Sequence, residues 1–228
     1  MTEISAGPEM PRFTLKLDHP DLLVGLVMVS GLDAGPSVGA LADWLDERVA
    51  NADDPPESTR QAVRQLLKHT GFKATGRNKP ASEYLAEARK RGEFPRILDC
   101  VDVMNVISLE SGFPISILDL DKVRALHPDV DGPGLCVRIG APGENYAFNA
   151  SGHIIELANL LGVAIEGGPL IANPVKDSVP TKVGPNTHTI LAVIYASRKA
   201  TTPEGLHKLG ERFAAQLGGG RVAVVAAS

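Results

Sequence analysis

The chain has 228 residues, of which 43% are hydrophobic and 22% charged, with only one Trp. This composition is typical of a globular protein with an aliphatic core, and it excludes a disordered chain. The formal net charge of −4 argues against a protein that coats nucleic acid without specificity. We interpret residues 12–228 as one domain, preceded by a flexible tail at residues 1–11.

The charges are unevenly distributed along the chain. Residues 1–60 carry 4 basic and 11 acidic side chains, whereas residues 61–100 carry 9 basic and 4 acidic ones. A basic block of this kind is more often a solvated helix surface than a patch that faces phosphate. Both interpretations stay open at this point.

Cysteine usage and hydropathy address cofactors and location. Cys100 and Cys136 lie in apolar runs without metal-ligand spacing, so we expect two buried thiols, no metal site and no cofactor. No apolar run approaches the ~20 residues that span a bilayer, and the N-terminus lacks the layout of a signal peptide. We therefore expect no membrane partner and a cytoplasmic location.

The first third of the chain predicts strands and then helices. Alternating side chains at residues 13–17 predict a short strand, and the apolar run at residues 22–29 predicts a buried one. Ser37 is placed to cap a helix that ends near residue 50. The predicted inward stripe of this helix is Val38, Leu41, Leu45 and Val49.

Two further helices flank a basic loop. Apolar side chains at helical spacing predict a helix at residues 58–70. The loop at residues 71–80 is basic, and Ser82 fits the N-cap of a helix that ends near Arg91. This arrangement places the basic loop between two helix ends.

Residues 99–121, DCVDVMNVISLESGFPISILDLD, begin with a helical pattern. Asp102, Asn105 and Ser108 recur every three residues between apolar side chains. A helix would gather these three side chains into one polar ridge. The ridge is therefore expected to face something other than a plain core.

A turn and an extended run follow this helix. Gly112 is expected at the end of the helix, and Pro114 prevents its continuation. Residues 115–121 then alternate as a strand or an extended loop would. Asp119 and Asp121 are expected to anchor a turn or backbone amides.

The second half of the chain reads mostly as strands. Residues 154–165 fit two strands or one helix, and residues 167–185 form a long constrained loop of a kind that is usually functional. Strands are also predicted at residues 135–139, 146–148, 189–195 and 221–226, with an amphipathic helix at residues 203–217. The irregular interleaving predicts an α+β fold with mixed or antiparallel sheets and packed helices.

Residues 101–123 resemble the most characteristic segment of the B3/B4 domain, the aminoacyl-tRNA editing domain of the phenylalanyl-tRNA synthetase beta chain. They are most similar to its free-standing members. The specific combination is Asn105, the Gly-x-Pro turn at residues 112–114 and the Asp-Leu-Asp at residues 119–121. Weaker similarity extends over residues 12–217.

The resemblance implies an α+β domain with a central pocket between two sub-lobes, where the synthetase hydrolyses the ester that joins tyrosine to tRNA. Asn105 matches a pocket asparagine, and Ser116 stands at the position of a pocket histidine. Arg96 lies beside the position of a pocket arginine. The acidic residue that receives the tyrosine hydroxyl falls within residues 167–185, where Asp177 is the carboxylate.

Ester hydrolysis needs a positioned water and donors for the developing oxyanion. We predict Asn105 and Asp177 as the catalytic residues, although Asn105 could equally brace the turn. The predicted substrate-binding residues are Arg96, Ser108, Ser116, Asn173, Ser178 and Thr181. The predicted RNA-binding residues are Arg77, Lys79, Lys176 and Lys182.

The sequence thus favours a free-standing aminoacyl-tRNA editing-like domain that binds, and as an ester hydrolase deacylates, mischarged aminoacyl-tRNA. The alternative is a non-catalytic module that binds an amino-acid-like small ligand or RNA. A third hypothesis is a purely structural or partner-binding protein. The choice among the three and the oligomeric state stay open at this stage.

Overall fold

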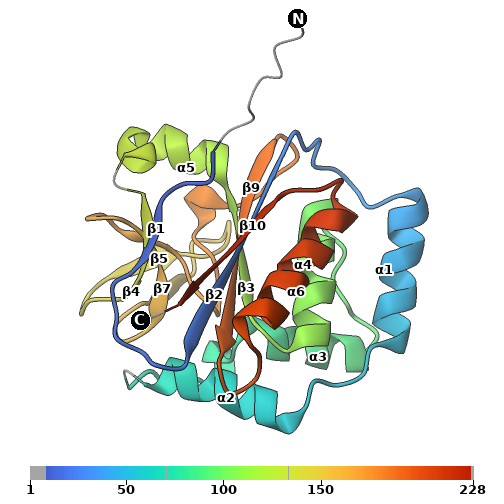
Figure 1. The fold of residues 1–228 in the computed structure, drawn as a ribbon, viewed down its shortest axis with the longest axis horizontal. Coiled ribbons are helices and arrows are strands. Elements are labelled where there is room, and N and C mark those ends of the chain that lie inside the picture. The colour runs from blue at the N-terminus through green and yellow to red at the C-terminus, as the bar shows by residue number, and fades with distance from the viewer. Residues whose placement is uncertain (1–8, 70, 133, 227–228) are drawn as a thin grey trace, which may run out of the picture.

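The computed structural model describes residues 9–69, 71–132 and 134–226. At its centre lies a four-stranded sheet, antiparallel throughout, with helices on one face and a second sheet on the other (Figure 1). The strands of the central sheet are β2 (Leu22–Ser30), β3 (Ile115–Asp119), β9 (Thr189–Ser197) and β10 (Arg221–Ala226). Their order is β10-β2-β9-β3, so that β3 forms one edge.

The second sheet is smaller and mixed. Its strands are β1 (Phe13–Leu15), β4 (Leu135–Ile139), β7 (Leu161–Ile165) and β8 (Leu170–Ala172), in that order. β1 pairs with β4 in parallel, and the other pairs are antiparallel. A separate hairpin joins β5 (Asn145–Ala147) to β6 (Ile154–Glu156). Residues 154–165 therefore hold two strands, and the predicted α+β fold with mixed and antiparallel sheets is confirmed.

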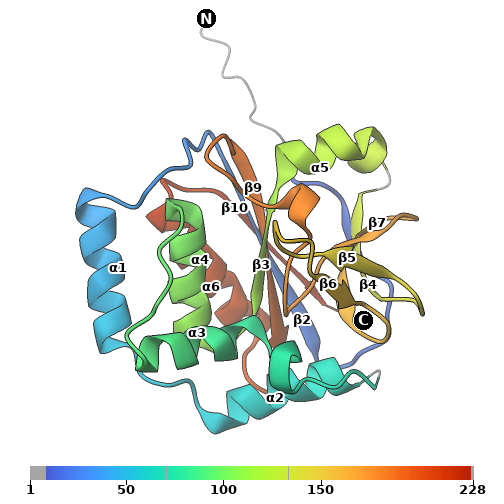
Figure 2. The same ribbon diagram turned by 180° about the vertical axis from the view of Figure 1, so that it is seen from behind.

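Most of the helices form a layer on the other side of the central sheet. The helices are α1 (Gly39–Asn51), α2 (Glu57–Lys68), α3 (Ala81–Lys90), α4 (Asp99–Ser111), α5 (Leu120–Leu126) and α6 (Pro203–Gln216). α5 is the exception, since it lies on the side of the second sheet, where Leu120 and Val123 join the core. Figure 2 shows α1, α3, α4 and α6 together on that side, with α2 across one end. In the part of the chain that the structure describes, no helix combines the length and hydrophobicity needed to cross a bilayer.

Both faces of the central sheet are buried, as its strand sequences require. Because side chains alternate along a strand, β2 sends one set to the second sheet and the other to the helices. Leu22, Val24, Leu26 and Met28 belong to the core shared with the second sheet. Leu23, Val27 and Val29 belong to the core shared with α4 and α6. The apolar run at residues 22–29 is therefore continuous rather than alternating.

The predicted helix stop after residue 111 is confirmed. Gly112 is the C-cap of α4, with a φ of 73°, and its backbone N–H donates to the Ser108 carbonyl. A Cβ at this position would lie 2.8 Å from Cβ of Pro55. Glycine is thus required both by the left-handed backbone and by the close approach of the chain before α2.

Replacing Gly112 by alanine is expected to lower the free energy of unfolding by about 2–4 kcal/mol, because backbone strain and overpacking add. Gly143→Ala is the matched control, since Gly143 also has a positive φ of 82° but no atom within 4 Å of its added Cβ. Urea denaturation of both variants measures the difference. If both variants lose the same free energy of unfolding, the close approach of Pro55 to Gly112 contributes nothing to the effect.

Two predicted helix caps are wrong. α1 begins at Gly39, and the Ser37 hydroxyl instead donates to the Asp102 carboxylate at 2.7 Å. Val38 is 73% exposed and so does not belong to the core stripe. In α3 the N-cap is Pro80, and Ser82 lies inside the first turn.

The structure contains short elements that were not predicted after residue 119 and within residues 167–185. β3 ends at Asp119, whose carboxylate accepts the backbone N–H of Lys122 and starts α5. This bond confirms Asp119 as an anchor of backbone amides, but α5 itself was not predicted. The predicted loop at residues 167–185 contains β8 and a short 3-10 helix, Val179–Thr181. Residues 1–8 of the predicted tail lie outside the described residues.

Candidate functional site

Asp177 lies in the segment after β8, which runs along the free edge of β3. Its Oδ2 accepts the outward backbone N–H of Ile117 at 3.1 Å. Its Oδ1 is buried and has no hydrogen-bond partner among the described atoms. A buried carboxylate oxygen without a partner is uncommon in a folded protein, because desolvation is then uncompensated.

Hydroxyl and amide groups surround this carboxylate and form the Asp177 cluster: Asp177, Ser116, Tyr195, Tyr146 and Asn173. The Ser116 hydroxyl donates to the Asn173 carbonyl at 3.1 Å and lies 3.1 Å from the Tyr195 hydroxyl. The Tyr146 hydroxyl donates to the Lys176 carbonyl at 2.6 Å and accepts from the Asn173 amide. Strands β3, β5 and β9 and the segment after β8 thus converge here.

The acid–base properties of the cluster follow from burial. Desolvation raises the pKa of Asp177 to about 6, against the opposing effects of the Ser116 hydroxyl and the Ile117 amide. Desolvation and the neighbouring Asp177 charge raise the pKa of both Tyr146 and Tyr195. The two phenols therefore stay neutral hydrogen-bond donors, while the carboxyl group titrates close to neutrality.

Asn105, the other predicted catalytic residue, does not lie beside Asp177. It sits on α4, whose buried side chains Val103, Val106 and Ile107 pack in the core on the helical face of the central sheet. Ser116 instead points from the opposite face, where its hydroxyl meets Tyr195. The structure therefore does not bring together the two residues predicted as catalytic, Asn105 and Asp177.

Two predicted substrate-binding residues are also distant from the cluster. Ser108 is fully buried on α4, and its hydroxyl donates to the Phe113 carbonyl at 2.7 Å. Arg96 precedes α4 and forms an ion pair with Asp46 of α1. Both side chains thus have structural partners on the helical side of the central sheet, which corrects their assignment to the pocket of Asp177.

The remaining predicted substrate-binding residues, Asn173, Ser178 and Thr181, lie in the same segment as Asp177. The Asn173 amide oxygen accepts the backbone N–H groups of Val175 and Lys176. The Thr181 hydroxyl donates to the carbonyl of Ile171 at 3.3 Å. Ser178 is 6% exposed. The hydrogen bonds of Asn173 and Thr181 hold the segment in shape.

The end of the basic loop contacts the segment that carries Lys176 and Lys182, two of the predicted RNA-binding lysines. The backbone N–H of Ala81, at the end of the basic loop, donates to the Pro174 carbonyl at 2.9 Å. Lys79 pairs with Glu87 at 2.6 Å. Lys176 lies over the ring of Phe148, and Lys182 donates to the Phe148 carbonyl. The side chain of Arg77 lies outside the described residues.

Tyr146 and Tyr195 were not predicted as site residues. Tyr146 lies in β5, predicted only as a short strand, and Tyr195 lies in β9, predicted as a buried strand, where it is indeed 1% exposed. The sequence offered one indication of their role, because the hydroxyl group of a buried tyrosine needs a hydrogen-bond partner. No motif or spacing marked the two positions. Only the fold shows that Tyr146 and Tyr195 belong to one cluster with Asp177.

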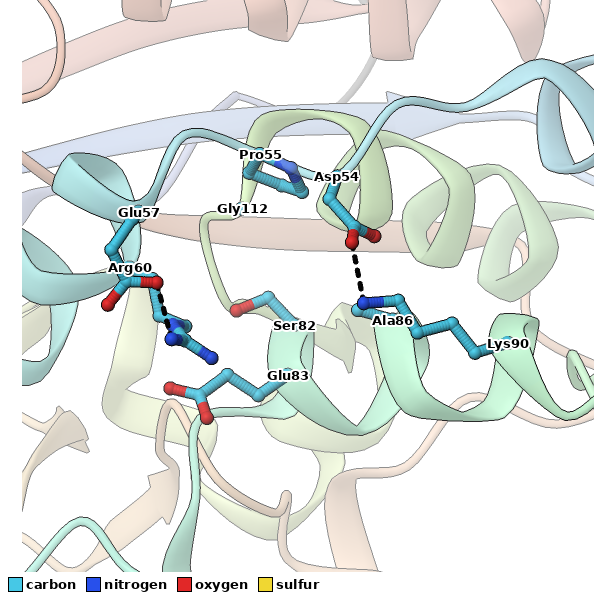
Figure 3. A pocket seen from close by; sticks show the side chains of 9 residues that line it. All are labelled: Asp54, Pro55, Glu57, Arg60, Ser82, Glu83, Ala86, Lys90 and Gly112. Atoms are coloured by element: carbon cyan, nitrogen blue, oxygen red, sulfur yellow. Dashed lines mark ion pairs between the residues drawn. The ribbon is translucent and has the colours of Figure 1, made fainter.

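Another cleft, of about 300 Å³, lies between the N-terminal ends of α2 and α3 and Gly112 (Figure 3). Its charged side chains are already paired: Asp54 with Lys90, Glu57 with Arg60, and Glu83 with Arg64 outside the cleft. Among the residues that the structure describes, no three His, Cys, Asp or Glu side chains are grouped as metal ligands. Cys100 and Cys136 are buried and free, and burial raises the pKa of Cys100 to about 12.

Comparison with known protein families identifies the family of the chain. The model of the B3/4 domain matches residues 69–212, which is more than half of the chain. The chain belongs to the B3/4 domain family. No curated protein matches it. The matched span of this B3/4 domain contains every residue of the Asp177 cluster, and the resemblance first noted at residues 101–123 is confirmed. Membership associates the chain with phenylalanyl-tRNA synthetase-related, tRNA-associated proteins.

Proposed function

We propose that this B3/4 domain binds aminoacyl-tRNA and hydrolyses the ester of mischarged species, with Asp177 as the general base. The observation that supports this most is the buried Oδ1 of Asp177 on a carboxyl group whose pKa is about 6. At neutral pH such a group is mostly ionised, yet it is basic enough to take a proton from water as a bond forms.

In the proposed reaction, the Asp177 carboxylate accepts a proton from a water molecule while the water oxygen attacks the ester carbonyl. The carbonyl oxygen becomes an oxyanion, towards which the hydroxyls of Ser116 and Tyr195 can turn as donors. When the bond to the ribose oxygen breaks, that oxygen takes the proton from Asp177. The products are the free amino acid and the uncharged tRNA.

The positions of the lysines support approach by RNA from the side of Phe148. Lys176 is the residue next to Asp177, and the charge of Lys182 lowers the pKa of Asp177 in part. Cations beside a hydrolytic group suit a substrate whose ester lies next to phosphates. The positive charge of both lysines would place the tRNA end against the Asp177 cluster.

A non-catalytic binding module is the second candidate function, and the close packing of the cluster favours it. Ser116 has no exposed surface, and its hydroxyl already has two partners. A substrate must therefore displace part of the segment at residues 173–178 before its ester reaches Asp177. A protein that only binds a ligand at the rim would need no such movement.

Incubation of the purified protein with a panel of mischarged tRNAs separates the two candidates. The proposed function predicts release of the amino acid from at least one species, faster than spontaneous hydrolysis. Absence of deacylation with every species would reject the catalytic proposal. Calorimetric binding of the same tRNAs, or of free amino acids, without hydrolysis would support the binding module instead.

A further inference from the structure

Two aromatic rings stand at the end of the β5–β6 hairpin. The rings of Phe148 and His153 stack with their centroids 6.1 Å apart and their planes at 24°. Asn149 holds the imidazole in place, since its amide donates to Nδ1 of His153 at 2.9 Å and its carbonyl accepts the His153 backbone N–H at 3.0 Å. The pair is therefore fixed in orientation before any ligand arrives.

A cleft of about 590 Å³ opens beside this pair. Its walls come from three parts of the fold: the hairpin, the basic loop and the residue before Asp177. The lining residues are Asn78, Phe148, His153, Ile154, Ile155, Glu156 and Lys176. Ile154 is 60% exposed, so the rim beside the rings is apolar and accessible. The volume lies within the range of small-ligand sites.

The charges around the rings are arranged for an anionic, flat ligand. The Lys176 ammonium lies 3.8 Å from the centre of the Phe148 ring, and Lys182 reaches the Phe148 carbonyl. Glu156 is the acidic residue of the lining, and its carboxylate can accept the exocyclic amine of a base. Stacking rings next to cations are the elements that bind single-stranded RNA.

We propose that the Phe148–His153 pair is a stacking platform for the 3′-terminal base of the bound RNA. The inference rests on the proposed function, because the ester on the same nucleotide would be cleaved at Asp177. The platform is close to Asp177, since Lys176, the residue before it, contacts the Phe148 ring. Lys176 precedes Asp177 in the chain, so their Cα atoms lie ~3.8 Å apart. When the base stacks, the Lys176 ammonium moves from the ring to the adjoining phosphate.

The test compares two 5′-labelled stem–loop RNAs, one ending in single-stranded CCA and one lacking the final A, by fluorescence anisotropy. Wild-type protein is expected to bind the complete RNA more tightly by about 5-fold to 150-fold, the usual range for one stacked base. Phe148→Leu is expected to bring this ratio close to one, and Phe148→Tyr to retain it. Ile97→Ala, at an exposed site preceding α4, is the control and should bind as the wild type does.

Leucine preserves the apolar volume of Phe148 but not its aromatic face, so a purely structural role would leave the ratio unchanged in Phe148→Leu. That result would overturn the proposal, as would equal binding of both RNAs by the wild type, which leaves the proposed function intact. If neither RNA binds, adenosine monophosphate tests the platform alone, and the deacylation of mischarged tRNAs decides the proposed function separately. If adenosine monophosphate binds to the wild type but not to Phe148→Leu, the platform is supported. If adenosine monophosphate does not bind to the wild type, the platform is overturned.

Discussion

Replacing Asp177 by asparagine is expected to slow the deacylation of a susceptible mischarged tRNA by about 100-fold or more, the usual contribution of a general base. Asparagine keeps the size of the side chain and an oxygen for the Ile117 backbone N–H, but it cannot accept the proton of the attacking water. Single-turnover release of labelled amino acid measures the effect without interference from product release.

The pH profile connects this loss to the carboxyl group. Burial raises the pKa of Asp177 to about 6, so the wild-type rate should increase about tenfold per pH unit below pH 6 and level off above it. The residual rate of Asp177→Asn should lack this inflection. A wild-type profile that is flat between pH 5 and pH 8 would reject Asp177 as the base.

Asn105→Ala provides the control for this assignment. Because Asn105 lies on the helical face of the central sheet, its replacement is expected to leave the inflection near pH 6 in place. A folded Asn105→Ala protein that loses the same 100-fold would contradict the separation of the two residues. Circular dichroism of both variants verifies that the rates are compared between folded proteins.

Local patterns along the sequence were sufficient for much of the fold. The helical pattern at residues 99–111 predicts α4, and Gly112 with Pro114 predicts where the helix ends. The apolar runs at β2 and β9 predict buried strands. These features depend on side-chain periodicity and backbone preference within a few residues, so no tertiary knowledge is needed.

The composition of the site could not be predicted in the same way. Asn105 and Ser116 are 11 positions apart in one segment, and the sequence does not show that the central sheet separates their side chains. That separation depends on which face of β3 meets which layer. A one-residue change in strand register would reverse it, because successive side chains point to opposite faces.

Contacts between residues far apart in the sequence explain why the two tyrosines of the site were not predicted. Tyr146 and Tyr195 come from different sheets and meet Asp177 only because the segment after β8 runs along the edge of β3. Short elements such as α5, with seven residues, lack enough periodicity to stand out. The side-chain cap of Asp119 was foreseen as a backbone anchor, but its helix could not be distinguished from a turn.

The same Asp177→Asn change is expected to stabilise the protein at neutral pH while it removes activity. Because the pKa of Asp177 is raised in the folded state, the folded protein binds the proton more tightly than the unfolded chain does. The carboxyl group therefore costs no stability below pH 4, and the cost grows as the pH rises towards 6. Above that pH it reaches at most about 3 kcal/mol, the free energy of a shift of roughly two pKa units.

Urea denaturation of wild type and Asp177→Asn at pH 4 and pH 8 measures this cost. The variant should be more stable than the wild type at pH 8 by up to about 3 kcal/mol, and the difference should nearly vanish at pH 4. Asp43→Asn, on the exposed surface of α1, is the control for removing a carboxylate without burial. If the negative charge of Asp177 stabilised the folded protein, its replacement by asparagine would destabilise the protein at pH 8. A gain in stability combined with a loss of hydrolysis is instead the signature of a carboxylate kept for its chemistry.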